Sequence, residues 1–247
     1  MALPLLDNTD LPLVLLGGTL CNARLWQPVI ERLNVPAVLS VTLTGAESAR
    51  QASRRLLTVL PPRFLLAGFS LGAIVALQIA ADAPERLKGL ALMSVNPLAD
   101  PPENAARRRE AVRAARSQGV AEWLASSLWR SYVAPSRLHD RALREVICRM
   151  AEECGIATLA QQTEIAIHRQ DNRAAFNALS CPTLLINGAQ DAICTPQHHQ
   201  LLAAGNADAT WYTVETGGHF IPLETPDEVA PPLRQWITEC IQCATTD

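Results

Sequence analysis

Short apolar runs alternate with longer segments of helical periodicity along most of this chain. The apolar runs cover residues 11–16, 37–43, 64–69, 87–94, 182–187 and 210–215. Short continuous apolar runs bounded by turn residues predict strands that are buried on both faces, as in a parallel sheet. Because these strands alternate with helices, we expect an α/β fold with a mostly parallel, doubly wound sheet.

The segments between these runs predict the helices that cover the sheet. Helical spacing of apolar residues is found at residues 23–33, 44–60, 71–83, 197–204 and 227–243. Asn22 precedes the first of these segments and is expected to cap its N-terminus. Pro61 and Pro62 end the second, because proline lacks the amide hydrogen that a helix interior needs.

A long, purely helical region interrupts the alternation. Helices are predicted at residues 104–118, 120–132, 136–154 and 156–168, with no strand among them. This stretch is too long for a simple crossover between parallel strands. We expect residues 96–177 to form a helical lid inserted after the fourth strand and lying over one edge of the sheet. Residues 1–95 and 178–247 would then form the core.

The most informative local motif surrounds Ser70. The stretch Gly68-Phe69-Ser70-Leu71-Gly72 fits the pattern G-x-S-x-G between a predicted strand and a predicted helix. This context is typical of a nucleophile elbow, a sharp turn that exposes the serine hydroxyl. The two glycines leave room for strand and helix to approach closely, and the serine at the tip is expected to have a strained backbone.

The same stretch has an alternative interpretation as a membrane span. No residue from Phe64 to Ala81 is charged, and Gly68 and Gly72 also fit the small-xxx-small pattern of packed membrane helices. A buried strand followed by a buried helix explains the run better, because glycines weaken a helix but suit the end of a strand.

Two further polar residues follow predicted strands. Asp191 comes after the run at 182–187, and His219 comes after the run at 210–215. A serine hydroxyl becomes nucleophilic when a neutral imidazole takes its proton, and a carboxylate orients that imidazole. The order Ser70, Asp191, His219 therefore predicts a catalytic triad. Asp208 and Glu215 fit the position of the acid less well.

Hydrolysis through such a triad also needs two backbone amides that form an oxyanion hole. Leu71 follows the predicted nucleophile in the first turn of its helix, where amides are free and the helix dipole favours negative charge. The second amide is expected from the loop after the first strand. We predict Thr19 for this role, with Leu20 as the second choice.

Composition narrows the class of partner and the compartment. A net charge of -3 and a pI near 6.0 over 247 residues give no reason to expect nucleic acid or a membrane surface as partner. The N-terminus lacks the basic and apolar regions of a signal peptide. Seven scattered cysteines are typical of reduced thiols, and Cys240 and Cys243 are expected to be ordinary helix residues. We expect a cytoplasmic protein without a metal or a cofactor.

The motifs together resemble the α/β-hydrolase superfamily over nearly the whole chain. The similarity is strongest to its small bacterial esterase-like members, which include carboxylesterases and the BioH-like and MenH-like enzymes. It rests on residues 15–19 with Leu25 and Trp26, on the Ser70 motif, on residues 188–191 with Pro196, and on residues 218–226. The resemblance implies that Ser70 is the nucleophile, His219 the base and Asp191 its orienting acid, with the helical region as lid.

Two departures from the family pattern concern the neighbourhood of the oxyanion hole. Gly17 stands where the family's His-Gly motif has its histidine, so different hydrogen bonds must brace this loop. The family's Asp-x-Pro-Gly-x-Gly-x-Ser loop is reduced to Thr42-Leu43-Thr44-Gly45. Both departures bear on the shape of the acyl pocket.

Several further side chains are candidates for the site. Trp123, Trp129 and Tyr132 are expected either to form the core of the lid or to wall an apolar acyl pocket. Leu20 and Phe220 are further candidates for substrate contact.

Outside this group, His198 and His199 lie at a polar helix start and are expected to be solvated. Glu224 and Asp227 are expected to support the site or to cap a helix.

The predicted lid is locally basic. The segment from Ala105 to Met150 contains ten arginines and four acidic residues, which gives it a local charge of +6. This segment is either a solvated helix face or a docking surface for an acyl carrier protein or a carboxylated substrate. The arginines are Arg107, Arg108, Arg109, Arg113, Arg116, Arg130, Arg137, Arg141, Arg144 and Arg149.

The sequence therefore predicts a cofactor-free serine hydrolase similar to carboxylesterases. It would cleave a carboxylic ester or thioester of a small to medium acyl group through an acyl-enzyme on Ser70. Acyl transfer, MenH-like elimination and C–C bond cleavage are alternatives that use the same triad, and a non-catalytic binding protein is a further alternative. Dehalogenase and epoxide hydrolase chemistry is disfavoured, because both need aspartate at the position of Ser70.

Overall fold

Six parallel strands form the sheet of this protein, in the order β2-β1-β3-β4-β5-β6. The structure is a computed structural model, and it describes residues 11–33, 35 and 37–245. The strands are β1 (Leu13–Leu16), β2 (Val38–Val41), β3 (Phe64–Phe69), β4 (Leu87–Met93), β5 (Thr183–Gly188) and β6 (Thr210–Val214). Every pair of neighbouring strands is parallel, which confirms the predicted fold class.

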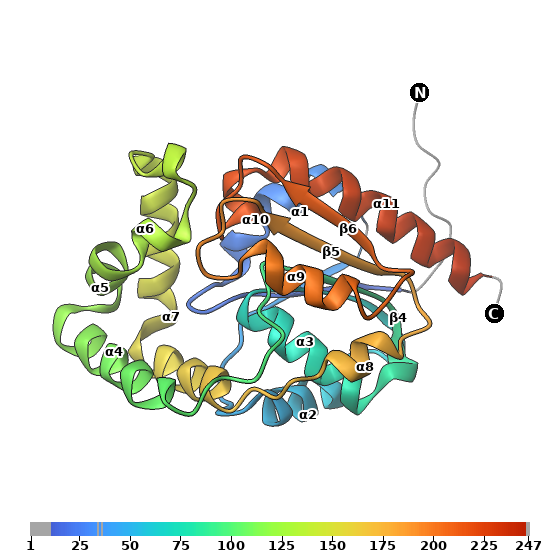
Figure 1. Cartoon of the computed structure of the whole chain (residues 1–247), viewed down its shortest axis with the longest axis horizontal. Helices are drawn as coiled ribbons and strands as arrows, with labels where there is room; N and C mark the ends of the chain where they lie inside the picture. The colour runs from blue at the N-terminus through green and yellow to red at the C-terminus, as the bar shows by residue number, and fades with distance from the viewer. Residues whose placement is uncertain (1–10, 34, 36, 246–247) are drawn as a thin grey trace.

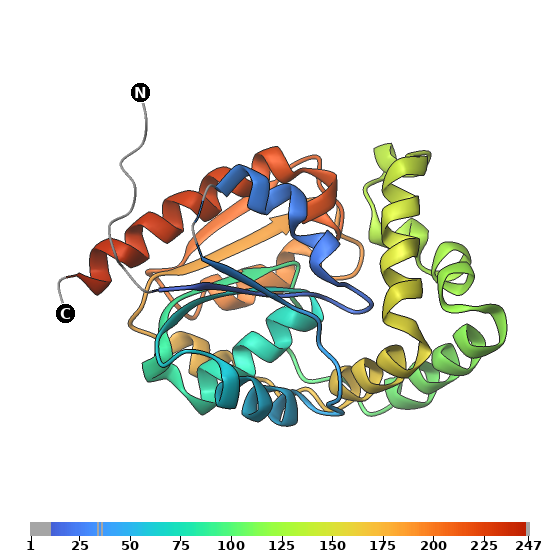
Figure 2. The same cartoon turned by 180° about the vertical axis from the view of Figure 1, so that it is seen from behind.

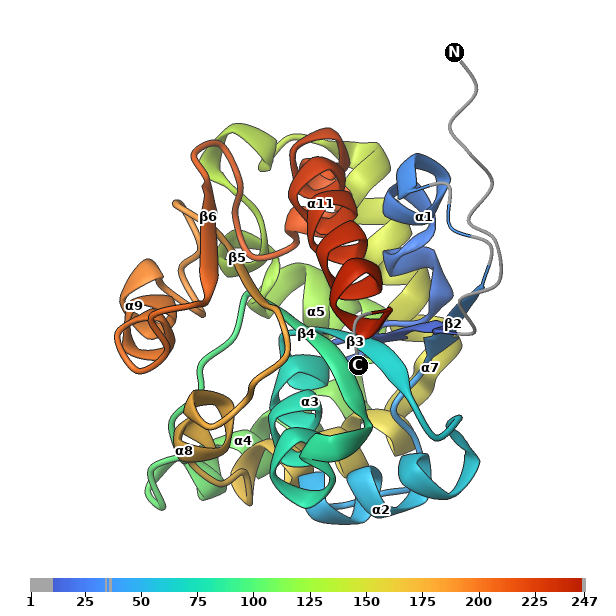
Figure 3. The same ribbon diagram turned by 90° about the vertical axis from the view of Figure 1, so that its right-hand side faces the viewer.

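Helices cover both faces of the sheet (Figures 1 and 3). On one face lie α1 (Gln27–Leu33) and α11 (Pro226–Ala244), and on the other lie α2 (Ala49–Val59), α3 (Leu71–Asp82), α8 (Arg173–Asn177) and α9 (Pro196–Ala203). Alternate residues of each strand face the two layers. In β1, Leu13 and Leu15 join one core cluster, and Val14 and Leu16 join the other. Burial on both faces explains the uninterrupted apolar runs of the sequence.

A helical insertion, which we define as α4 to α7, separates the neighbouring strands β4 and β5. It comprises α4 (Asn104–Gln118), α5 (Val120–Ser127), α6 (Trp129–Tyr132) and α7 (Arg141–Ile167). These helices pack on one another beside the carboxyl ends of the strands (Figures 1 and 2). The helices expected at 136–154 and 156–168 form one element, α7, with a kink at Gly155, whose φ is +75°. The division into a core and a lid domain stays a prediction.

Helix boundaries follow the capping residues. Asn22 accepts a hydrogen bond from the Arg24 amide at 3.0 Å, as expected of a cap, at a short 3₁₀ turn (Ala23–Leu25) before α1. The helix expected over 44–60 begins at Ala49, because Ser48 accepts the Gln51 amide at 3.2 Å and caps α2 there. A short helix, α10 (Ile221–Glu224), was not predicted from the sequence.

The two glycines of the Ser70 motif allow α3 to pack closely against β1, at Gly72, and against β3, at Gly68. A Cβ atom on Gly72 would lie 2.2 Å from the Leu16 carbonyl oxygen, and one on Gly68 would lie 2.6 Å from the Gly72 carbonyl oxygen. The uncharged stretch from Phe64 to Ala81 is thus a strand and a helix of the core. Within the described residues, no helix is long and apolar enough to cross a membrane.

Candidate functional site

Ser70 lies at the tip of the turn between β3 and α3. Its backbone has φ 52° and ψ -113°, a combination that non-glycine residues rarely adopt. The Ser70 amide donates to the Met93 carbonyl at 2.9 Å, which fixes this turn to the end of β4. The strained serine backbone predicted from the motif is therefore present.

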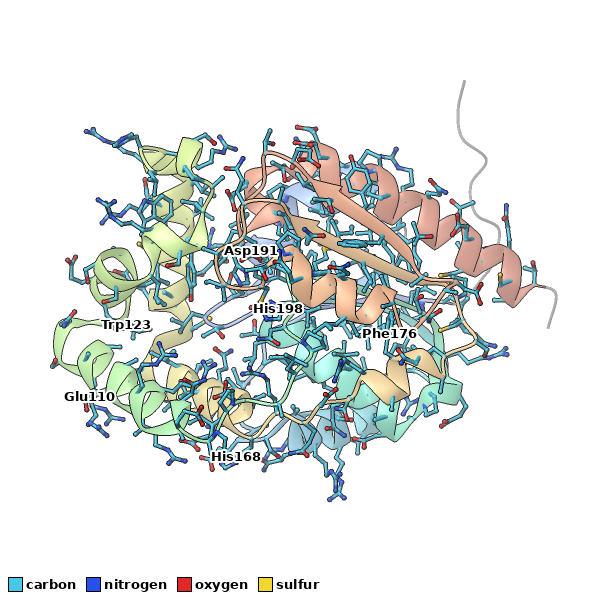
Figure 4. The ribbon with its side chains drawn as sticks, viewed as in Figure 1. Glu110, Trp123, His168, Phe176, Asp191 and His198 are labelled. Atoms are coloured by element: carbon cyan, nitrogen blue, oxygen red, sulfur yellow. The ribbon has the colours of Figure 1, made fainter. Side chains whose placement is uncertain are left out.

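The structure brings Ser70, His219 and Asp191 into one hydrogen-bonded chain. His219 Nε2 lies 3.0 Å from Ser70 Oγ, and His219 Nδ1 lies 2.8 Å from Asp191 Oδ2. The other carboxylate oxygen of Asp191 accepts the amides of Ile193 and Cys194, each at 2.8 Å. Figure 4 shows Asp191 at the end of the sheet that faces the insertion. The three residues predicted from sequence order thus meet where parallel strands end.

Burial and charge shift the pKa values of His219 and Asp191 in opposite directions. Burial alone would lower the pKa of His219 and raise the pKa of Asp191. Because the two groups are hydrogen-bonded, the Asp191 carboxylate raises the pKa of His219 above its ordinary value. The pKa of Asp191 is correspondingly lowered by His219 and by the two backbone amides. The Asp191 carboxylate is therefore ionised and keeps a proton on Nδ1 of His219. Nε2 of His219 is then the nitrogen that faces Ser70.

Two amides at the site are available to a negatively charged oxygen. Leu71 begins α3, so its amide has no acceptor within the helix. Within the described residues, neither the Leu71 amide nor the Thr19 amide donates a hydrogen bond. Both residues line the same cavity as Ser70. The amide of Leu20, by contrast, donates to Gln162 Oε1 at 2.8 Å and is already used.

Gln162 of α7 is a site residue that the sequence analysis missed. Its side chain is fully buried, and its Nε2 donates to the Leu43 carbonyl at 2.9 Å while its Oε1 accepts from Leu20. Gln162 therefore connects the loops that follow β1 and β2, and supplies the bracing that Gly17 cannot. Its spacing of three residues from Leu159 and Ile165 was a usable signal, because it places a polar side chain on the apolar face of α7.

A cavity of about 320 Å³ lies between the sheet and the insertion. We call it the Ser70 cavity, and its lining includes the predicted substrate contacts Trp123, Tyr132 and Phe220. Leu20 and Trp129, the other two candidate contacts, are not among its lining residues, which for Trp129 agrees with the lid-core alternative. Leu20 is buried, and its amide bonds to Gln162.

Trp129 belongs to the core of the insertion. Its Nε1 donates to the Leu138 carbonyl at 3.0 Å, and the Arg144 guanidinium lies 6.0 Å from its ring centroid. An indole that is anchored in this way fills the interior of the helical layer. Of the three aromatic residues expected in the lid, Trp123 and Tyr132 face the cavity and Trp129 does not.

His199 was expected to be solvated, and this expectation was wrong, because the side chain is fully buried. Its Nε2 accepts a hydrogen bond from the Val95 amide at 3.1 Å, which requires the neutral ring. Burial lowers the pKa of His199 to about 4. The residue fixes the chain just after β4, and its neighbour His198 is half-buried near Asp191 (Figure 4).

Glu224 connects the insertion to the loop that carries His219. Its Oε2 accepts the Ala134 amide at 2.7 Å and the Gly218 amide at 3.2 Å. The side chain is buried, and burial raises its pKa above the ordinary value. Asp227, the other acid expected in a supporting role, forms an exposed ion pair with Arg32 at 2.7 Å.

Two groups stand out among the arginines in and next to the insertion. Several pair with acids on the outer surface, namely Arg109 with Glu164, Arg113 with Glu110, Arg137 with Asp140 and Arg149 with Glu145. Glu110 lies on the outer side of α4 in Figure 4. A second group lines the Ser70 cavity and consists of Arg107, Arg108 and, from beyond the predicted basic segment, Arg169.

Asp191, Cys194 and His219 form a group that has the donor types for a metal ion. Their potential ligand atoms lie within 4.8 Å of one another, and all three side chains are buried. Asp191 and His219 already share a hydrogen bond, however, and a metal between them would have to break it. The arrangement fits proton transfer between Ser70 and His219 better than metal binding.

Comparison with known proteins gives relatives that match most of this chain. The Biotin biosynthesis bifunctional protein BioHC of Cellvibrio japonicus is 25% identical over 88% of this chain, which spans only 45% of that protein. The chain spans less than half the length of the BioHC relatives it matches. The Pimeloyl-[acyl-carrier protein] methyl ester esterase of Aromatoleum aromaticum is 29% identical over 88% of this chain and 94% of its own length.

Solved structures show the same fold. A thermophilic esterase from Thermogutta terrifontis superposes with a TM-score of 0.82 at 24% identity, covering 94% of this chain and 91% of that one. The enol-lactonase from Burkholderia xenovorans superposes with a TM-score of 0.81 at 20% identity, covering 93% and 92%. The family model of the alpha/beta hydrolase family matches residues 13–231. The chain therefore belongs to the alpha/beta hydrolase family.

Proposed function

We propose that this protein is an ester-hydrolysing enzyme that works through an acyl-enzyme on Ser70. The observation that carries the proposal is the hydrogen-bonded chain from Ser70 through His219 to Asp191, which opens into a cavity lined by two free amides. The names of the relatives support the class of reaction, because they include methyl ester esterases and a putative carbamate hydrolase.

The proposed reaction has two halves. Ser70 Oγ attacks the ester carbonyl while His219 Nε2 takes the hydroxyl proton, and the amides of Thr19 and Leu71 stabilise the oxyanion. The proton then passes from His219 to the leaving alcohol. In the second half, water attacks the acyl-serine while His219 takes a proton of the water, and His219 then returns this proton to Ser70 Oγ as the carboxylic acid product leaves.

Cavity size and lining support a small to medium acyl group. The cavity volume is about 320 Å³, and its apolar wall includes Ile74, Trp123, Leu128 and Phe220. We propose that the segment 96–177 acts as a lid over the core formed by 1–95 and 178–247, because its helices supply one side of this wall.

The test is intact-mass labelling with a fluorophosphonate combined with turnover of p-nitrophenyl esters from acetyl to octanoyl. We expect one label per chain and turnover that peaks at one acyl length, with both lost in Ser70→Ala. Ser117→Ala, at an exposed position of α4, is the matched control and keeps both. Labelling without ester turnover would instead support transfer, elimination or C–C cleavage by the same triad. No labelling would support a non-catalytic binder.

A carrier-bound ester is a second candidate substrate. Arg116, Arg130 and Arg141 are exposed and pair with no acid among the described residues, so they leave positive charge on the surface of the insertion. Such a face suits the acidic surface of an acyl carrier protein. Comparing kcat/KM for one methyl ester, free and carrier-linked, tests this candidate. We expect Arg116→Gln with Arg130→Gln to weaken only the carrier-linked reaction.

A further inference from the structure

The lining of the Ser70 cavity is strongly cationic on the side formed by α4 and by the segment that follows α7. Arg107, Arg108 and Arg169 all line it, and no described lining residue is acidic. Asp100 is the acid that pairs with this cluster. It binds Arg108 through both oxygens at 2.8 Å and binds Arg169 at 2.9 Å. The unit of Asp100, Arg108 and Arg169 therefore carries a net charge of +1, and Arg107 adds a second positive charge.

Arg169 is held rigidly, and one end of its guanidinium is unused. Its Nε donates to the Leu98 carbonyl at 2.8 Å, and its Nη1 donates to the Ala166 carbonyl at 3.1 Å as well as to Asp100. Its side chain is only 6% exposed. Within the described residues, nothing accepts a hydrogen bond from Nη2. A buried cation with a free donor at a cavity wall is a binding group for an anion, because an unpaired polar group in such a place is costly.

Neighbouring groups in the lining extend this donor surface. The side-chain amide of Asn96 accepts the Leu98 amide through Oδ1 at 3.1 Å, and its Nδ2 has no acceptor in the described part of the chain. Arg107 is exposed, and its one hydrogen bond among the described residues goes to Asn104 Oδ1, at 3.3 Å. The remaining lining is largely apolar and reaches Ser70. One cavity thus combines the hydrolytic serine, an apolar wall and a cluster of anion donors.

We propose that the substrate is a monoester of a dicarboxylic acid, whose ester lies at Ser70 and whose free carboxylate binds Arg169, Arg108 and Asn96. A carboxylate carries one negative charge, which matches the +1 of the buried Arg108–Asp100–Arg169 unit. Because Asp100 and backbone carbonyls occupy the other guanidinium nitrogens, Arg108 and Arg169 would each donate to the carboxylate through one remaining terminal nitrogen. This inference rests on the proposed function for the position of the ester, but the anion site itself does not depend on it.

The test compares two series of methyl esters with four to eight carbons in the acyl chain. One series ends in a free carboxylate, and the other ends in a neutral primary amide of the same shape. We expect the wild-type kcat/KM to favour the acid at one or more chain lengths by at least tenfold, with a smaller preference at high salt. Acid and amide esters that react within twofold at every length would overturn the proposal.

Arginine variants locate the anion site. We expect Arg169→Gln to reduce the acid-to-amide ratio by roughly 10- to 100-fold, the usual range for losing a hydrogen bond to a charged group. Arg107→Gln, at an exposed position that a folding defect does not confound, should reduce it by roughly threefold. Arg113→Gln is the matched control on α4, because Arg113 is exposed and pairs with Glu110. An unchanged ratio in both Arg169→Gln and Arg107→Gln contradicts the assignment.

A binding measurement separates this inference from the proposed function. We expect glutarate or adipate to slow fluorophosphonate labelling of Ser70 and to give a calorimetric binding signal, and the matching diamides to give neither. Normal labelling without protection by the diacids would overturn the inference and leave the esterase intact. If Ser70 were not labelled but the diacids still bound, the proposed esterase function would fail and the anion site would stand. Protection by inorganic phosphate but not by diacids would assign the site to a phosphate group and overturn the carboxylate.

Discussion

The side-chain carbonyl of Gln162 accepts the Leu20 amide at 2.8 Å, so a helix of the insertion holds the loop that follows β1. Leu20 has a φ of 56°, which a leucine adopts only under constraint. The adjacent Thr19 amide is left free to face the cavity. The geometry proposed for the oxyanion hole therefore depends on a residue that lies 142 positions away in the sequence.

Replacing Gln162 by leucine should lower kcat much more than it raises KM. The substitution removes the acceptor for Leu20 and the donor to Leu43, which frees the loop that carries the Thr19 amide. We expect kcat to fall roughly 10- to 100-fold, because a misplaced oxyanion donor loses much of its effect. Steady-state kinetics with a p-nitrophenyl ester measure this split.

Gln161→Leu is the matched control for this experiment. Gln161 lies beside Gln162 on α7, but its Oε1 accepts the Gly45 amide at 2.7 Å, and among the described residues it makes no hydrogen bond to the Leu20 loop. We expect a change in kcat of less than threefold. Gln162→Glu keeps the acceptor for Leu20 and should recover part of the activity. A Gln162→Leu enzyme with wild-type kcat would show that the loop holds its shape without this contact.

The acid limb of the pH–rate profile should lie above the ordinary pKa of histidine, which is about 6.5. His219 must be neutral to accept the Ser70 proton, and the Asp191 carboxylate raises its pKa. Activity therefore falls as the pH drops through this raised value. In Asp191→Asn the limb should move to lower pH, and kcat/KM should fall by roughly 10³- to 10⁴-fold.

Profiles of kcat/KM for an uncharged ester between pH 5 and 9 measure this limb. Substrate ionisation does not contribute with such an ester, so the limb reports the free enzyme. A wild-type profile that stays flat down to pH 5 is incompatible with His219 as the base.

His199 should make the protein less stable in mild acid. Its pKa is about 4 in the folded protein, against about 6.5 when unfolded, so the unfolded chain binds more protons between these values. The free energy of unfolding therefore declines as the pH falls from about 6.5 to about 4. The full effect is about 3 kcal/mol, at about 1.4 kcal/mol per pKa unit. Urea unfolding at several pH values measures it.

His199→Gln is the comparison variant for this effect. Glutamine does not titrate, so the variant should lose less stability than the wild type over the same pH interval, although it starts from a lower value at neutral pH. Parallel stability curves for the two proteins would show that another group causes the acid sensitivity.

Gly72→Ala should abolish both folding and activity. The new methyl group would lie 2.2 Å from the Leu16 carbonyl and 2.7 Å from the Gly17 carbonyl, and backbone atoms of a central strand cannot yield cheaply. We expect little soluble protein and no labelling of Ser70. Gly17→Ala is the milder comparison, because its nearest contact is 3.2 Å. Soluble, cooperatively unfolding Gly72→Ala protein would contradict this account.

The sequence predicted the fold and the Ser70, Asp191, His219 arrangement for a shared physical reason. Each of the three residues lies within four positions after an apolar run, and the carboxyl ends of parallel strands meet at one edge of the sheet. The close approach of strand and helix at Gly68 and Gly72 was also predictable, because it is local to the turn.

The missed residues have partners that are remote in the sequence. Gln162 contacts Leu20 and Leu43, and His199 contacts Val95, 104 positions away. Nothing in the spacing along one chain reports which loop a helix of the insertion will touch. Trp129 shows the same limit, because the sequence pattern around a helical aromatic residue is the same whether it faces a cavity or a neighbouring helix.

The insertion is joined to the rest of the molecule in a way that limits how freely it can be exchanged. It leaves the sheet after β4 and returns at β5, two strands that pair directly, so a foreign segment could be grafted between them without altering the sheet. Such a chimaera would nevertheless lose Gln162, which holds the Leu20 loop, and Ala134, whose amide binds Glu224 next to the His219 loop. Engineers who recombine this segment for new selectivity should carry both contacts across with it.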